Sequence, residues 1–229
     1  MFQRNTPYQI SYIFGGNFTD KIKRSISGSP SMALIAICVL SYLFEIFLFL
    51  TAPLLGDLYV QTFQFNPAYL LSRPWTSVTY IFLHNDFSHL LFNMLVLFFF
   101  GPALERRAGK KQMVGIFFTA GVLSAIGHAF MSIPLLGSSP LPIIGASGAI
   151  YGVFAALAVL EPELRVYVYF IPMRIKHALV LFALVDFLMI HSTDMVAHVA
   201  HLSGLFVGLY MGYRIKKLQE KYWRSQSRW

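Results

Sequence analysis

The sequence predicts an all-α membrane protein in which six helices cross the bilayer, and three observations support this. Of the 229 residues, 56% are hydrophobic and only 12% are charged, against about 25% charged in an ordinary soluble domain. Six separate segments are apolar and close to the length of about 20 residues that a spanning helix needs. Nearly all basic residues lie in the connections and tails that six crossings would place on the same side of the membrane.

The six apolar segments divide the chain into one domain and two tails. The expected helices are residues 31–51, 88–104, 112–133, 145–160, 177–193 and 195–213. Residues 1–30 are too polar for a cleavable signal peptide, and we expect them to form a cytoplasmic tail. Residues 31–213 would form the helical domain, and residues 214–229 a basic cytoplasmic tail. The fourth and fifth segments are short, and Pro162 and Pro172 bracket the link between them.

The long connection after the first segment is expected to lie in the outer membrane interface. It runs over residues 51–88 and contains many aromatic residues, among them Tyr59, Tyr69 and Trp75. Aromatic side chains with a polar tip concentrate at the boundary between lipid and water. We therefore predict a partly helical interfacial first loop.

The basic residues predict the orientation. All of the 18 Lys and Arg residues except Arg73 lie before the first segment, between the second and third, between the fourth and fifth, or after the sixth. The positive-inside rule then places both termini in the cytoplasm, and the short tails favour a prokaryotic plasma membrane. The net charge of +8 thus follows topology and contact with anionic lipid, and no nucleic-acid partner is expected.

Two residues in the expected spans suggest chemistry. Ser147 lies near the start of the fourth segment, and His201 lies in the sixth. An imidazole can take the proton that makes a serine hydroxyl a weak nucleophile, and ionisable groups inside a membrane mark functional sites. Both residues fall in the outer half of the bilayer, so we expect a water-filled depression that opens outward.

Glycines beside this pair predict a close helix contact. Gly148 and Gly152 are four residues apart, as are Gly204, Gly208 and Gly212. Small residues at this spacing let two helix backbones approach closely, although such stripes also occur where helices simply pack.

The second segment carries a further polar pair. His89 and Asn93 are one helical turn apart and share a face, where their N–H groups could stabilise a developing oxyanion. A pair that only satisfies interhelical hydrogen bonds is the alternative. His89, His198 and His201 could also bind zinc, but no carboxylate or cysteine completes an obvious set, so no metal or other cofactor is expected.

These patterns resemble those of the rhomboid intramembrane serine proteases. The family's motifs are GxSG, HxxGxxxG, HxxxN and GxxxExRxG, together with a tryptophan in the first loop. The segments that resemble them are, in the same order, residues 145–152 (GASGAIYG), 201–208 (HLSGLFVG), 89–93 (HLLFN), 101–109 (GPALERRAG) and Trp75. The resemblance covers about residues 31–213. It implies a six-helix rhomboid bundle.

The resemblance also implies roles for the residues of the site. Ser147 would be the nucleophile and His201 the general base, then the acid for the leaving amine. His89, Asn93 and the Ser147 backbone N–H would form the oxyanion hole, and Tyr151 would pack against His201. The substrate would be a single-span membrane protein cut in or near its outer membrane portion, admitted past the fifth helix, and no obligatory protein partner is evident.

Further residues would support this site. The supporting glycines would be Gly145, Gly148, Gly204 and Gly208. Glu105 and Arg107 would hold the first loop and the second helix in place, together with Trp75. Thr76 follows Trp75 where the family often has arginine, which affects the anchoring of the loop rather than the chemistry.

Several alternatives stay open. His198 lies one turn from His201 and could compete for the role of base, and Asp194 could orient His201 as the third member of a triad. Asp186 and Glu45 are expected to make interhelical hydrogen bonds, and His128 to be a buried polar group with a hydrogen-bond partner. The same three residues would form the proton relay if the protein were a small transporter. A rhomboid-like protein that binds membrane proteins without cutting them is the main alternative to an enzyme.

Overall fold

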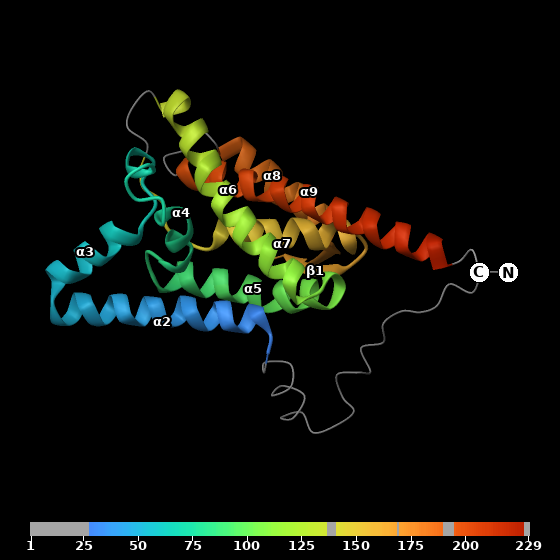
Figure 1. Ribbon diagram of the computed structural model, residues 1–229, viewed down its shortest axis with the longest axis horizontal. Coiled ribbons are helices and arrows are strands. Elements are labelled where there is room, and N and C mark those ends of the chain that lie inside the picture. Colours follow the sequence, from blue (N-terminus) through green and yellow to red (C-terminus); the bar gives the residue numbers. More distant parts are fainter. Residues whose placement is uncertain (1–27, 137–140, 169, 190–194, 227–229) are drawn as a thin grey trace, which may run out of the picture.

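The computed structural model describes residues 28–136, 141–168, 170–189 and 195–226, which form a helical bundle (Figure 1). Most of the predicted N-terminal tail, Asp194 and residues 227–229 therefore lie outside the described residues. The elements in chain order are α2 (Pro30–Thr51), α3 (Pro53–Phe63), η2 (Pro67–Tyr69), α4 (Thr76–Thr79), η3 (Tyr80–Phe82), α5 (Phe87–Ala108), α6 (Lys110–Leu136), α7 (Ser147–Leu160), β1 (Arg165–Val168), β2 (Ile171–Arg174), α8 (Ile175–Leu188) and α9 (Met195–Gln226).

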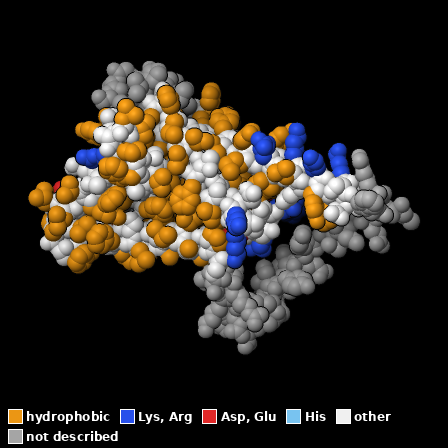
Figure 2. Space-filling model, viewed as in Figure 1, with side chains coloured by type: hydrophobic (Ala, Val, Ile, Leu, Met, Phe, Trp, Pro, Cys, Tyr) orange, Lys and Arg blue, Asp and Glu red, His pale blue; other side chains and the backbone are white. Residues whose placement is uncertain are grey.

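Helix α7 is the centre of the bundle. Eleven of its 14 residues are buried, and it packs against α5, α6, α8 and α9. Its buried residues are largely Gly and Ala, which leave room for neighbouring backbones. In contrast, α2 and α8 expose large apolar side chains, such as Leu50 and Phe187. Hydrophobic side chains also cover much of the face shown in Figure 2, as expected of a surface that contacts lipid.

Local signals in the sequence set the helix ends nearest the site. The Asp86 side chain caps α5 by accepting a hydrogen bond of 2.9 Å from the His89 backbone N–H. This cap satisfies a donor that the first turn of a helix leaves unpaired. Gly109, with a φ of 95°, ends α5 in a conformation that glycine adopts without steric cost. The cap places His89 in the first turn of α5.

Within the part of the chain that the structure describes, three helices are long and apolar enough to cross a membrane: α2, α5 and residues 110–130 of α6. Helix α7 is apolar but has only 14 residues. At 1.5 Å per residue it extends about 21 Å, less than the roughly 30 Å of a hydrocarbon core. A helix of this length can end below either membrane surface, so the depth of Ser147, its first residue, stays a prediction. The number of six crossings stays a prediction.

The structure differs from the sequence-based boundaries in two places. A two-stranded antiparallel hairpin, β1 and β2, stands in the predicted link between the fourth and fifth helices. Helix α9 continues to Gln226, so the described part of the predicted C-terminal tail is helical. The reason is that residues 214–226 contain neither Gly nor Pro and are rich in helix-forming Lys, Gln and Glu. The first loop contains α3, α4 and two short 3₁₀ helices, a partly helical segment.

Candidate active site

Several of the residues that the sequence predicts for the site line a cavity of about 850 Å³, but Asn93 is not one of its lining residues. Ser147, His201, His89 and Gly145 all line it, together with His198. They come from α5, α7, α9 and the segment before α7. Residues far apart in the sequence thus share one hollow, at the end of α7 where Ser147 lies.

The backbone before Ser147 fits closely against His89. Gly145 has a φ of 118°, and its N–H donates to the Tyr80 carbonyl oxygen at 2.9 Å. A Cβ atom at this position would lie 2.6 Å from Cε1 of the His89 ring, closer than real Cβ atoms come. Two features therefore require glycine at this position: the backbone conformation, and the close approach of the His89 ring to the segment that precedes Ser147.

His201 is held on two sides. The Tyr151 ring, one turn after Ser147 on α7, stacks on the His201 ring with centroids 4.4 Å apart and planes 10° apart. His201 Nδ1 lies 3.1 Å from Asp186 Oδ1. Among the described residues, no hydrogen bond joins the side chains of Ser147 and His201. Bonds between catalytic groups are often long before substrate binds.

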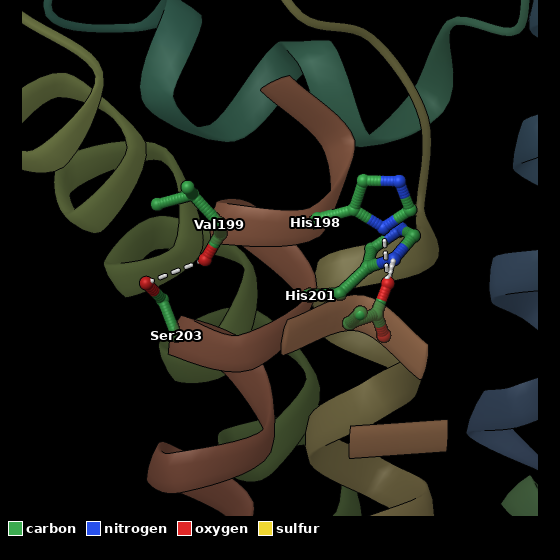
Figure 3. Close-up of polar contacts among 5 residues, drawn as sticks. His198, Val199, His201 and Ser203 are labelled. Carbon is green, nitrogen blue, oxygen red and sulfur yellow. Dashed lines mark hydrogen bonds and ion pairs between the residues drawn. The ribbon is translucent and has the colours of Figure 1, made fainter. Parts of the chain in front are cut away.

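Asp186 is the residue whose place at the site sequence reasoning missed. It comes from α8, is only 3% exposed, and its Oδ1 also lies 2.6 Å from His198 Nδ1. Figure 3 shows the His198 and His201 rings on the same side of α9, away from Ser203. Asp186 lies two residues before the end of α8, whereas His201 lies six residues after the start of α9. Distance from the connection between the two helices therefore gave no signal that these residues meet.

The three side chains also form a set of metal-type donors. One ligand atom from each of Asp186, His198 and His201 lies within 4.8 Å of the others. The expectation that no carboxylate completes a ligand set was wrong for this reason. Asp186 is distant in sequence from the His89 and His201 motifs, and only the packing of α8 on α9 brings it there.

Asn93 lies one turn from His89 on α5 and is buried. Its Nδ2 has no hydrogen-bond partner among the described residues. A buried amide with a free donor is uncommon because each unpaired group costs stability. His89 lines the cavity and can donate a hydrogen bond there, whereas the amide donor of Asn93 lies one turn further along α5.

Glycines bring α7 and α9 into backbone contact, as their spacing predicted. A Cβ atom at Gly204 would overlap the Gly148 carbonyl oxygen, and one at Gly208 would overlap the Gly152 carbonyl oxygen. Only helices that touch backbone to backbone produce such overlaps. This contact fixes the distance between the two helices that carry Ser147 and His201.

Glu105 and Arg107 hold the predicted second helix, α5, but within the described chain their contacts do not reach the first loop. Glu105 Oε1 accepts hydrogen bonds from Ser29 Oγ at 2.9 Å and from the Ser31 backbone N–H at 2.7 Å. Arg107 Nε lies 2.6 Å from Glu161 Oε1. Both residues sit at the C-terminal end of α5, so they join α5 to α2 and α7 rather than to the first loop.

Trp75 makes its hydrogen bond within the first loop. Its Nε1–H donates to the Thr62 carbonyl oxygen at 3.1 Å, and the side chain is about half exposed, at 47%. The bond ties the segment before α4 to the end of α3.

The loop before α5 holds a buried histidine beside the site. His84 is fully buried, and burial lowers its pKa to about 4, helped by the neighbouring His89. The two rings meet edge to face with centroids 5.1 Å apart. Next in the loop, the hydrogen bond from the His89 backbone N–H lowers the pKa of Asp86, which keeps the cap of α5 ionised.

Fold and site together define a helical membrane protein with a serine and a histidine at one cavity. The family model of the rhomboid domain matches residues 71–218. The chain belongs to the rhomboid family.

Three relatives illustrate the similarity. The putative rhomboid protease YdcA of Bacillus subtilis is 31% identical over 156 residues, which cover 65% of this chain and 71% of that protein. The rhomboid protease GlpG of Yersinia pseudotuberculosis is 24% identical over 213 residues, or 91% of this chain and 68% of that protein. GlpG of Salmonella choleraesuis is 27% identical over 200 residues, or 83% and 64%. The chain therefore belongs to a family of membrane proteases.

Proposed function

We propose that this protein is an intramembrane serine endopeptidase that cuts single-span membrane proteins in or near the outer part of the bilayer. Ser147 is the nucleophile and His201 the general base. The observation that carries this proposal is that both residues line one cavity, on two helices whose backbones touch at glycines. The names of the relatives agree with a protease.

The contact between Asp186 and His201 explains how the base is prepared. A carboxylate only accepts, so the proton of a neutral His201 lies on Nδ1, which faces Asp186 Oδ1. Nε2 then keeps a lone pair that can take the Ser147 proton. The Ser147 oxygen attacks the scissile carbonyl, and the protonated His201 gives its proton to the leaving amine. Water repeats the sequence on the acyl-enzyme, with His201 as base again.

The developing oxyanion needs donors that are in place beforehand. His89 lies against Gly145, just before Ser147, and Asn93 Nδ2 has no partner among the described residues. With the Ser147 backbone N–H these groups would bind the oxyanion. Removing one such donor costs about 3–4 kcal/mol of transition-state stabilisation in other serine proteases.

Hydrolysis in a membrane also needs water. Ser147 begins α7, and the 850 Å³ cavity beside it would hold the water that the reaction consumes. Because α7 extends only about 21 Å, it is short enough for Ser147 to lie below the outer membrane surface. Lys and Arg side chains gather around the C-terminal half of α9 (Figure 2), which supports a cytoplasmic position for that end. The site then faces the outer side of a prokaryotic plasma membrane.

The test is cleavage of a reporter single-span protein by the purified full chain in liposomes. Wild type should cut, and Ser147→Ala and His201→Ala should not, with unfolding temperatures unchanged. A fluorophosphonate probe should label wild type and neither variant. Labelling that survives His201→Ala would refute the dyad. Neither cleavage of several reporters nor labelling of Ser147 would favour a protein that binds membrane proteins without cutting them.

A further inference from the structure

The hydrolytic reaction leaves one histidine at the site without a task. His198 Nδ1 lies 2.6 Å from the same Asp186 oxygen that contacts His201. One base is enough for a serine hydrolase, so His198 duplicates a contact that the mechanism needs only once. Asp186 Oδ2, in addition, is buried and has no hydrogen-bond partner of normal geometry among the described residues.

These three side chains have the composition and spacing of a zinc site. Two imidazole nitrogens and one carboxylate are a frequent set of three protein ligands, with the fourth tetrahedral position left for solvent. Zinc bonds of about 2.0–2.2 Å place neighbouring donors about 3.3 Å apart. The two nitrogens now lie 2.6 and 3.1 Å from Asp186 Oδ1, and all three ligand atoms lie within 4.8 Å of one another. Small movements of the side chains would bring the three donors to that spacing.

The cluster is also accessible and supported. His198 and His201 both line the cavity beside Ser147, which gives an ion a route to them. Their side chains are only 14% and 17% exposed, and that of Asp186 only 4%, so an ion bound there would be largely shielded from solvent. Tyr151 stacks on His201 and limits the rotation of its ring.

We propose that Asp186, His198 and His201 bind a divalent transition metal ion of the zinc class, and that this binding switches the peptidase off. A metal ion on His201 Nδ1 requires that nitrogen to be deprotonated. The neutral ring must then carry its proton on Nε2. Nε2 becomes a hydrogen-bond donor and no longer accepts the Ser147 proton, so the metal removes the base without blocking Ser147.

The inhibitory half of this inference depends on the proposed peptidase function, whereas the binding half does not. Binding is therefore measured separately, by calorimetric titration of ZnCl₂ into the full chain in detergent, purified without a polyhistidine tag. Wild type and Ser147→Ala should each bind one zinc ion with the same affinity, because Ser147 is not a ligand.

Variants at His198 test the ligand set. His198→Ala should weaken zinc binding by about tenfold or more, since even the loss of a group that only orients a ligand costs 10–100-fold. His198→Gln, which can still hydrogen-bond Asp186, should weaken it equally. The matched control is His177→Ala, an exposed histidine on α8, which should leave zinc affinity unchanged. Equal zinc binding in the His198 and His177 variants would refute the site.

Inhibition is then measured on reporter cleavage, with each variant compared with its own zinc-free rate. Zinc should inhibit wild type, EDTA should restore the rate, and the inhibitory concentration should rise about tenfold or more in the His198 variants. Zinc inhibition that is unchanged by both His198 substitutions would refute the switch. Zinc binding by a chain that cleaves no reporter would refute the proposed function and leave the metal site standing.

Discussion

Among single residues, Asp186 is the one that we expect to set which nitrogen of His201 carries the proton. Its Oδ1 lies 3.1 Å from His201 Nδ1. An asparagine amide could donate to Nδ1 and so favour the tautomer whose Nε2 is protonated. The same change in another serine protease lowers kcat by about 10⁴. Asp186→Asn should lower kcat by on the order of 10²–10⁴ and leave KM nearly unchanged, as measured by steady-state reporter cleavage.

The matched control for this substitution is Asp57→Asn, at an exposed position of α3, which should keep the wild-type rate. Unfolding temperature separates a positioning role from a folding defect. If Asp186→Asn keeps kcat within about twofold of wild type, then Asp186 does not set the tautomer.

His84 should make the stability of the protein depend on pH. Its pKa is about 4 in the folded protein and about 6.5 in an unfolded chain. Below pH 6.5 the unfolded chain binds a proton that the folded protein does not, so stability falls as the pH falls from 6.5 toward 4. The loss should reach on the order of 2 kcal/mol at pH 4.5. Thermal unfolding of wild type and His84→Leu between pH 7.5 and 4.5 measures it.

The difference between the two proteins, rather than either curve alone, isolates His84, because carboxylates such as Asp86 also titrate in acid. His177→Leu, at an exposed position, should follow the wild-type curve. Parallel curves for wild type and His84→Leu would show that His84 does not contribute.

Between elements, the backbone contact of α7 with α9 is the feature that fixes the site. A Cβ atom at Gly208 would overlap the Gly152 carbonyl oxygen. Gly208→Ala should therefore push the helices apart, destabilise the protein by about 1–3 kcal/mol, and reduce cleavage by separating His201 from Ser147. Unfolding temperature and cleavage rate are the measurements.

The same substitution elsewhere provides the control. Gly115 lies in α6, where an added Cβ meets no atom within 4 Å. Gly115→Ala should leave activity unchanged and raise stability slightly, by up to about 1 kcal/mol, because alanine is the better helix former. Equal effects at Gly115 and Gly208 would show that the close contact does not control stability.

The elements also show what the sequence could and could not predict. Long apolar runs predict α2 and the start of α5 to within one residue, but the predicted second helix stops at residue 104, four residues before α5 ends. The hairpin of β1 and β2 was missed because each strand has four residues and one contains Pro172. The contact of Asp186 with two histidines depends on how α8 rotates against α9, which no local pattern encodes.

Across the whole molecule, charge and apolar surface are segregated. Basic side chains gather around the C-terminal half of α9 (Figure 2), whereas α3 lies at the opposite end of the bundle (Figure 1). A helical membrane protein of the rhomboid family is established by the family match, but the orientation is not. The segregation supports the prediction that the α9 end is cytoplasmic and the α3 end is outside.

The single cysteine makes this orientation testable. Cys38 is fully buried in α2, so Cys38→Ala gives a background without a reactive thiol. Asp57→Cys on α3 and Ser225→Cys near the end of α9 introduce one exposed thiol each. In intact bacterial spheroplasts, a membrane-impermeant maleimide should label the cysteine at position 57 at once, and the cysteine at position 225 only after permeabilisation. The reverse labelling pattern would show that the protein has the opposite orientation in the membrane. Labelling of both cysteines without permeabilisation would exclude six crossings, because six crossings place five of them, an odd number, between α3 and the end of α9.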